Sequence, residues 1–146
     1  MSETISAAAA NKALLEHVFA ETAKGNGRPF LDALADDASW TIRGTTGWSK
    51  TYRGKAEIMD RLIAPLLRVL APPLKTHSCR MIAEGDIVVV EARGQNVTRD
   101  GKPYENDYCY FYEFRDGEVV ALTEYADTEL FRSALGEPAQ TPAAQR

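Results

Sequence analysis

Residues 74–128 decide the fold, and they read LKTHSCRMIAEGDIVVVEARGQNVTRDGKPYENDYCYFYEFRDGEVVALTEYADT. Three turn signals divide this stretch: Glu84-Gly85-Asp86, Asp100-Gly101 and Asp116-Gly117. An Asp-Gly pair between strand-like runs predicts a hairpin, because glycine accepts the positive φ angle that tight hairpin turns require. The stretch therefore predicts an antiparallel meander of four strands. The predicted strands are Leu74–Ala83, Ile87–Thr98, Tyr104–Phe114 and Val119–Thr128.

The residues before this stretch predict three helices and one more strand. Apolar side chains at helical spacing predict a helix over residues 7–24, and a proline suited to a first helical turn predicts a short helix over residues 29–34. Residues 39–43 alternate as a strand, and a third helix begins at Gly54 and ends before Pro72-Pro73. The layout indicates an α+β domain: a curved antiparallel sheet wrapped by three N-terminal helices into a cone with a central pocket.

Length and composition fit one domain. The chain has 146 residues, of which 45% are hydrophobic and 26% charged, as in ordinary globular proteins. We expect a single domain over residues 1–146, with its folded core over residues 8–132 and a disordered tail over residues 136–146. The formal net charge of −4, with scattered lysines and arginines, argues against a nucleic-acid partner. No apolar run is long enough to span a membrane.

The cysteines and histidines predict a protein without a cofactor. Cys79 and Cys109 lie in strand-like runs with no signal peptide before them, so we expect reduced, buried thiols and a cytoplasmic protein. His17 and His77 are far apart and lack metal-ligand spacing, and the sequence has no phosphate-binding glycine loop. We therefore expect no metal and no nucleotide cofactor.

Side-chain alternation along the strands predicts a polar pocket. We expect the strand faces that carry the polar residues to point into the cone, together with Trp40 of the first strand. The resulting set is Glu91, Arg93, Asn106, Tyr108, Tyr110, Tyr125 and Asp127. Trp48, in a glycine-containing loop, is expected to cover the pocket mouth. The same assignment turns Glu124 away from the pocket, toward an interface or solvent.

The charged members of this set form a usable acid/base group, because a guanidinium keeps one carboxylate ionised while burial raises the pKa of another. Asp127 is the expected general acid/base, Arg93 its charge partner and Glu91 the second carboxylate. The tyrosines and Asn106 are expected to bind a carbonyl or enolate oxygen. Two alternatives stay open: the charged residues form a structural ion network, and the aromatic residues belong to the core or to a dimer interface.

One face of the second meander strand is small and apolar. It carries Val88, Val90, Ala92 and Gly94, with Cys109 and Phe111 beside it. Left exposed, this face would form a large apolar patch. We therefore expect a homodimer that buries it.

Four short segments follow one another with a recognisable order and spacing. They are Ala35-Asp36-Asp37-Ala38, Tyr52-Arg53-Gly54-Lys55, Phe114-Arg115-Asp116-Gly117 and Glu124-Tyr125-Ala126-Asp127. In this order the chain resembles the nuclear-transport-factor-2-like superfamily over residues 8–132, and within it the SnoaL-like and ketosteroid-isomerase-related branch. The resemblance implies the cone-shaped fold and a small hydrophobic molecule as partner. It does not fix the reaction, since the superfamily includes polyketide cyclases, steroid isomerases, epoxide hydrolases, dehydratases and non-enzymatic binding modules.

Several catalytic residues of these relatives are missing from this sequence, which argues against some of their reactions. The positions of the steroid isomerase's base, oxyanion tyrosine and protonated aspartate hold Ile42, Val18 and Tyr110. The Arg-x-Asp pair of the epoxide hydrolases corresponds to Glu91-Ala92-Arg93, which has the opposite order, while the late-strand aspartate of the SnoaL cyclases matches Asp127. The favoured hypothesis is an enzyme that isomerises, cyclises, dehydrates or hydrates a hydrophobic or polyketide-like metabolite by acid/base chemistry. The alternatives are a non-catalytic module that binds a hydrophobic ligand and a structural dimerisation module.

Overall fold

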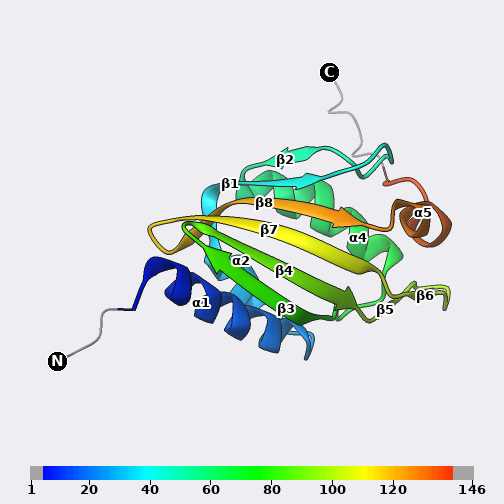
Figure 1. Cartoon of the computed structure of the whole chain (residues 1–146). Helices are drawn as coiled ribbons and strands as arrows, with labels where there is room; N and C mark the ends of the chain where they lie inside the picture. Colours follow the sequence, from blue (N-terminus) through cyan, green and yellow to red (C-terminus); the bar gives the residue numbers. More distant parts are fainter. Residues whose placement is uncertain (1–4, 140–146) are drawn as a thin grey trace, which may run out of the picture.

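The computed structural model of the chain describes residues 5–139 and consists of a curved sheet with helices packed against it (Figure 1). Six strands form the sheet in the order β2-β1-β8-β7-β4-β3. They are β1 (Leu34–Ile42), β2 (Thr51–Arg53), β3 (Thr76–Glu84), β4 (Ile87–Gly94), β7 (Asp107–Arg115) and β8 (Glu118–Ala126). The strands β5 (Asn96–Val97) and β6 (Pro103–Tyr104) form a small separate hairpin. The α+β class and the curved sheet predicted from the sequence are confirmed.

Three helical segments precede the meander, as predicted. They are α1 (Ala7–Thr22), α2 (Arg28–Ala33) and a longer segment in which α3 (Lys55–Glu57), the π-helical η1 (Ile58–Ile63) and α4 (Ala64–Val69) follow one another. A further helix lies beyond the end of β8 (Figure 1), where α5 (Thr128–Leu130) continues as the π-helical η2 (Phe131–Leu135). The sequence patterns do not predict this last helix. Within residues 5–139, every helix is too short or too polar to cross a membrane.

The predicted meander is confirmed, since β3, β4, β7 and β8 are antiparallel neighbours in that order. Two features differ from the prediction. The second meander strand ends at Gly94 rather than Thr98, because the chain then leaves the sheet to form β5 and β6. The sheet is also not purely antiparallel: β1 pairs in parallel with β8, with Trp40 opposite Leu122.

The inner face of the sheet carries the apolar residues of β4. Val88, Val90 and Ala92 are buried, with Tyr112 and Tyr110 of β7 opposite the two valines. The prediction that these β4 residues form an outer, dimer-forming face is therefore wrong. Their burial follows from the hydrophobic effect, since they are the most apolar residues that the strand offers to the interior.

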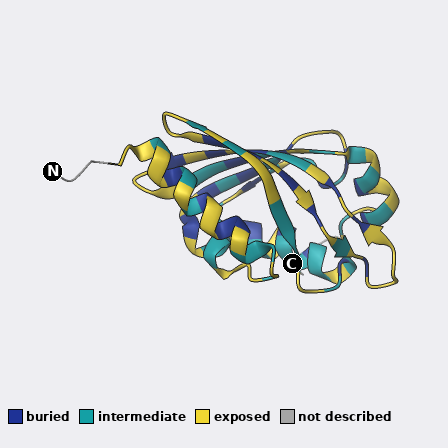
Figure 2. Ribbon diagram, turned by 60° about the horizontal axis from the view of Figure 1, so that its bottom comes forward, coloured by how far each residue is buried: buried dark blue, intermediate teal, exposed yellow. Residues whose placement is uncertain are grey.

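The helix α1 packs its apolar stripe onto this inner face, with Leu15, Val18 and Phe19 buried. Figure 2 shows the contrast between this side of α1 and its exposed outer side. On the outer face of the sheet, Cys79 is exposed and Cys109 is half-buried. The prediction of two buried thiols is therefore wrong for Cys79.

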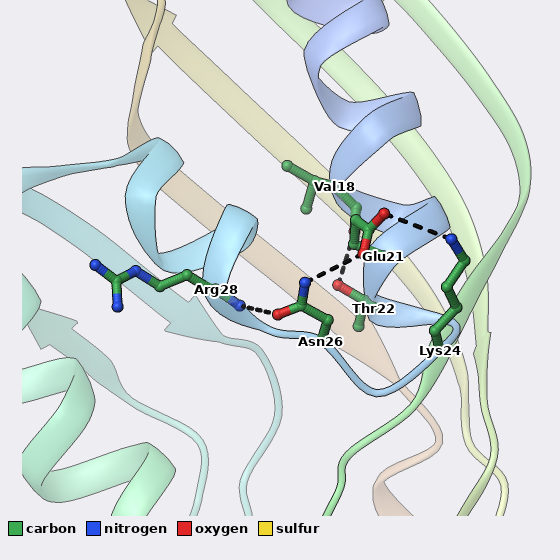
Figure 3. A network of polar contacts seen from close by, with 6 residues as sticks. All are labelled: Val18, Glu21, Thr22, Lys24, Asn26 and Arg28. Atoms are coloured by element: carbon green, nitrogen blue, oxygen red, sulfur yellow. Dashed lines mark hydrogen bonds and ion pairs between the residues drawn. The ribbon is translucent and has the colours of Figure 1, made fainter.

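Local polar contacts hold the turn between α1 and α2 (Figure 3). The Thr22 hydroxyl donates a hydrogen bond to the Val18 carbonyl oxygen at 2.9 Å. The Asn26 amide donates to the Glu21 carboxylate at 3.1 Å, and the Asn26 side-chain oxygen accepts from the Arg28 backbone N–H at 3.2 Å. These contacts fix the start of α2 beside the end of α1, and so shape the interior between the two helices and the sheet.

Candidate active site

The interior of the cone contains a cavity with two adjoining lobes. The smaller lobe has a volume of about 100 Å³ and lies between the sheet, α4 and the helix that follows β8. The larger lobe, of about 190 Å³, lies between the sheet, α1 and α2. Five side chains line both lobes, which therefore lie side by side: Trp40, Ile63, Leu74, Thr76 and Tyr110.

A single carboxylic acid lies in the smaller lobe. Glu124, on β8, lines this lobe and is only 4% exposed. Burial raises its pKa to about 8, and the Trp40 indole N–H lowers the pKa only in part. This N–H is buried and does not reach a normal hydrogen-bond geometry with any described residue. The carboxyl group is therefore mostly protonated at neutral pH.

A β-bulge in β8 explains why Glu124 faces inward. The pairing with β7 shifts by one residue just after Val119, which leaves Val120 as an extra residue in β8. One extra residue moves every later side chain of a strand to the opposite face. Tyr125 lies on the opposite face of β8 from Glu124 and is exposed, and Asp127 follows the end of the strand, so the predicted inward placement of both residues is wrong.

Tyr110 lies directly opposite Glu124 on the neighbouring strand β7 and lines both lobes. Its ring stacks on that of Tyr108, with centroids 5.1 Å apart. The hydroxyls of Tyr108 and Tyr104 share a hydrogen bond of 3.3 Å, whereas the Tyr110 hydroxyl has no partner among the described residues. Burial, and to a lesser extent the Glu124 carboxylate, raise the pKa of Tyr110 well above its usual value. Its hydroxyl therefore keeps its proton and can donate a hydrogen bond to a ligand oxygen.

Asn106 and Asp127 together hold the end of β8. The Asn106 side-chain oxygen accepts from the Asp127 backbone N–H at 3.0 Å, and the amide donates to the Asp127 carbonyl oxygen at 3.2 Å. The same amide donates to the Tyr104 hydroxyl at 3.1 Å. Both polar atoms of the Asn106 side chain are therefore hydrogen-bonded within the protein. The Asp127 carboxylate lies outside the cavity and accepts from the backbone N–H groups of Glu129 and Leu130, which caps α5.

Glu91 and Arg93 lie on the outer face of β4. Glu91 forms an ion pair with Arg80 at 3.1 Å, and Arg93 forms one with Asp107 at 3.3 Å. All four side chains are largely exposed, so solvent screens both pairs and each contributes little to stability. Their predicted inward orientation is wrong, because the apolar residues of β4 occupy its buried face. The predicted contact between Arg93 and Asp127 does not form within the described part of the chain.

Four of the predicted ligand-binding residues do meet at the smaller lobe, which Trp40, Trp48, Tyr108 and Tyr110 line. Tyr125 is exposed on the outer face, where its ring packs edge-on against Phe111. Glu124 was not predicted as an inward residue. Phe131 and Leu135, which line the same lobe from the C-terminal helix, were not predicted either.

The sequence of residues 15–122 matches the profile that describes the SnoaL-like domain. The chain belongs to the SnoaL-like domain family. Membership of the nuclear-transport-factor-2-like superfamily, predicted from the sequence, is thereby confirmed. A search of curated proteins gave no match to this SnoaL-like domain.

Several solved structures share the fold of this SnoaL-like domain. An NTF2-like protein from Burkholderia pseudomallei has a TM-score of 0.74 at 19% identity, covering 86% of this chain and 97% of its own. TerC, co-crystallised with polyporic acid, has a TM-score of 0.73 at 22% identity, covering 86% and 98%. A protein of ketosteroid-isomerase-like fold from Catenulispora acidiphila, in complex with trimethylamine, has a TM-score of 0.67 at 17% identity, covering 88% and 97%. At these identities the likeness concerns the fold alone.

The C-terminal strap of the SnoaL-like domain, residues 128–138, closes the smaller lobe. The Trp48 indole N–H donates to the Gly136 carbonyl oxygen at 2.8 Å, and Arg132 donates to the Thr45 carbonyl oxygen at 3.3 Å. At Gly47, a side-chain Cβ would lie 2.9 Å from the Pro138 Cδ, so only glycine permits this approach without a shift. Trp48 therefore lines the smaller lobe and also holds the strap in place through its hydrogen bond to Gly136. Residues 140–146 of the predicted disordered tail lie outside the described residues.

The described part of the SnoaL-like domain contains no group of three or more histidine, cysteine, aspartate or glutamate side chains that could hold a metal ion. The chemistry available in the cavity is that of one carboxylic acid and several hydroxyl and indole donors. These groups can transfer a proton and stabilise charge on a ligand oxygen.

Proposed function

We propose that this SnoaL-like domain is an enzyme that uses Glu124 as a general acid/base on a small hydrophobic molecule. The observation that carries the proposal is a lone carboxyl group, 4% exposed, at the wall of a mainly apolar cavity. Burying a carboxylic acid without a charge partner lowers the stability of the fold. This cost favours a functional role for Glu124. A general acid/base must both accept and release a proton, which requires a pKa near neutral pH such as that of Glu124.

The proposed step begins with ionised Glu124, which takes a proton from a carbon next to a substrate carbonyl. The electron pair of the broken C–H bond moves to the oxygen, and the Tyr110 hydroxyl stabilises the enolate by donating a hydrogen bond. Protonated Glu124 then returns the proton to the same or another carbon, which gives exchange or isomerisation. Alternatively, the enolate carbon attacks a second carbonyl, and protonated Glu124 gives its proton to the alkoxide oxygen that forms, which completes a cyclisation.

Solvent deuterium exchange at the carbon next to the carbonyl of 1-tetralone tests this proposal. We expect the wild-type protein to accelerate exchange, and Glu124→Gln to lower the accelerated rate at least about 100-fold, because it removes the proton-transfer group. The wild-type rate should rise with pH and level off above about 8, where Glu124 is ionised. The matched control is Glu113→Gln, an exposed residue of β7, which should exchange at the wild-type rate. Equal rates for Glu124→Gln and wild type would sink the proposal.

A non-catalytic module that binds a hydrophobic ligand is the second candidate. The observation that favours it is the absence of any lysine, arginine or histidine among the described residues that line either lobe, so Glu124 has no ionic partner in catalysis. TerC, crystallised with polyporic acid, supports small-molecule binding by this fold. Binding of 1-tetralone without exchange faster than that in buffer would favour this second function.

We further propose that the protein forms a homodimer through the outer face of its sheet. Ile82, Val89 and Phe111 form a row across β3, β4 and β7, in which Ile82 is 60% and Phe111 40% exposed. Such a row is an apolar patch that a second copy would cover. We expect a dimer mass by light scattering at micromolar concentration, and a monomer mass for Phe111→Lys. Val97→Lys, an exposed apolar position outside this sheet, is the control and should remain dimeric; a wild-type monomer would contradict the prediction.

A further inference from the structure

The C-terminal strap, residues 128–138, is the most weakly attached wall of the smaller lobe. It follows β8 at one end of the sheet (Figure 1) and contributes the buried side chains of Phe131 and Leu135 to the lining. Among the described residues, its only backbone hydrogen bond to a residue outside it joins the Phe131 N–H to the Asp127 carbonyl oxygen, at 3.3 Å. The strap is therefore held mainly by side chains, and such an element opens at lower cost than a strand inside a sheet.

The other walls of the smaller lobe are tied together by backbone hydrogen bonds. The strands β1, β8, β7 and β4 pair with one another along most of their length. The end of α4 is held by the Ala71 N–H, which donates to the Val97 carbonyl oxygen at 2.9 Å, and by the Arg99 N–H, which donates to that of Val69 at 2.8 Å. Of the walls around Glu124, the strap can therefore move with the smallest loss of structure.

The two ends of the strap are held differently. At its start, the buried Asn106 side chain bonds both backbone groups of Asp127, and the Asp127 carboxylate caps α5. At its far end, the Trp48 indole N–H donates to the Gly136 carbonyl oxygen at 2.8 Å, and an exposed contact from Arg132 to a loop carbonyl oxygen, at 3.3 Å, adds to this. A firmly held start and a lightly held far end are the two parts of a hinged lid.

We propose that the strap is a lid, which opens about Asp127 when the hydrogen bond between Trp48 and Gly136 breaks, and that a small molecule reaches the smaller lobe and Glu124 through this opening. Closure restores the state in which Glu124 is 4% exposed, and so keeps bulk water away from the carboxyl group. This goes beyond the proposed function, because access to the lobe is needed for catalysis and for binding alike.

Native-state hydrogen exchange of the wild-type protein, measured without urea and at up to about 1 M urea, distinguishes a lid from a fixed wall. We expect the amides of residues 131–135 to be protected at least about 100-fold less than those of residues 109–113 in β7. Their exchange should also be nearly independent of urea, because opening the strap exposes little new surface, whereas exchange in β7 should rise with urea. Strap amides with the protection and the urea dependence of β7 would overturn the proposal.

Gly47→Ala loosens the far end of the strap without changing a residue that lines the lobe. The added Cβ would lie 2.9 Å from the Pro138 Cδ, so the closed strap must shift. We expect the protection of residues 131–135 to fall at least about fivefold and that of β7 to change by less than about twofold. Gly27→Ala is the matched control, because a Cβ there meets no atom within 4 Å, and it should leave both unchanged. Equal losses in the strap and in β7 for Gly47→Ala would contradict a separately opening lid.

Entry past the strap is measured with acrylamide, a small neutral quencher of tryptophan fluorescence. The chain has two tryptophans, Trp40 and Trp48, and both line the smaller lobe. Trp40→Phe leaves Trp48, 1% exposed, as the only reporter. Adding Gly47→Ala to this reporter should raise the bimolecular quenching constant at least about twofold, because the lid is open for more of the time, whereas adding Gly27→Ala should not change it.

An equal quenching constant with and without Gly47→Ala would overturn entry past the strap. If Trp40→Phe does not fold, the same comparison is made with both tryptophans present. Neither hydrogen exchange nor quenching requires turnover, so a strap that does not open separately leaves the proposed catalysis standing. In the same way, a failure to accelerate deuterium exchange of 1-tetralone leaves the lid standing.

Discussion

Raising the pH from about 5 to about 9 should destabilise the wild-type protein by on the order of 3–5 kcal/mol, and Glu124→Gln should remove most of this loss. The group responsible is Glu124, whose pKa burial raises to about 8 in the folded protein. In the unfolded chain the same group titrates near its ordinary value of 4.5. Between these two values the folded state holds a proton that the unfolded state has released.

The sign of the effect follows from this difference in bound protons. The free energy of unfolding falls with rising pH wherever the folded state binds more protons than the unfolded state. The contribution of Glu124 is therefore fully present below pH 4.5 and is lost as the pH rises through about 8. Glu124 interacts electrostatically with five tyrosines whose pKa values are all raised above their ordinary value: Tyr52, Tyr104, Tyr108, Tyr110 and Tyr112. They stay neutral throughout this range.

Urea denaturation at intervals between pH 5 and pH 9 measures the effect for wild type and for Glu124→Gln. The difference between the two curves isolates Glu124 from the histidines, which both proteins share. Glu113→Gln on the exposed face of β7 should follow the wild-type curve. Parallel curves for wild type and Glu124→Gln would show that the carboxyl group titrates normally, and would remove the electrostatic basis of the proposed chemistry.

Trp48→Ala should cost about 3–5 kcal/mol of stability and release the C-terminal strap. The Trp48 side chain is 1% exposed, and its indole N–H donates to the Gly136 carbonyl oxygen. The Trp48 carbonyl oxygen in turn accepts from the Tyr52 hydroxyl at 2.9 Å. Truncation thus leaves a large cavity beside the smaller lobe and removes a hydrogen bond of the strap. Urea denaturation gives the energy, and hydrogen exchange of residues 128–138 reports the release.

Trp48→Phe is the matched control, because it keeps an aromatic ring and removes only the N–H and part of the volume. We expect it to cost about 1–2 kcal/mol, with a smaller rise in hydrogen exchange of the strap. If hydrogen exchange of the strap is unchanged in Trp48→Ala, the hydrogen bond to Gly136 does not hold the strap. A loss of less than about 1 kcal/mol would contradict the burial of Trp48.

The order of the meander was predictable because its turns are local. The Asp-Gly pairs at residues 100–101 and 116–117 specify reversals through a few residues each, and no distant contact competes with them. The parallel pairing of β1 with β8 was not predictable in this way, since no local pattern records which strand lies beside β1. The C-terminal helix was missed for the same reason: its apolar residues Phe131 and Leu135 are stabilised by the cavity wall that they complete.

The candidate site was predicted only in part because the faces of β4 and β8 that carry Glu91, Arg93 and Tyr125 were expected to point inward, and both point outward. A signal for the bulge is present in β8: Val119 and Leu122 are both apolar but three residues apart, and a regular strand cannot bury both. An extra residue between them makes both burials compatible and turns Glu124 inward. On β4 the prediction placed Glu91 and Arg93 inward to build a polar pocket, and the hydrophobic effect favours the opposite orientation.

The parallel contact between β1 and β8 also determines when the nascent protein can fold during synthesis. Residues 34–42 leave the ribosome well before their inner neighbour in the sheet, residues 118–126. Until that last strand emerges, β1 has only the short β2 as a partner, and the apolar faces of α1 and α2 lack a complete sheet to cover. β1 therefore stays without its inner neighbour until the whole meander has been synthesised.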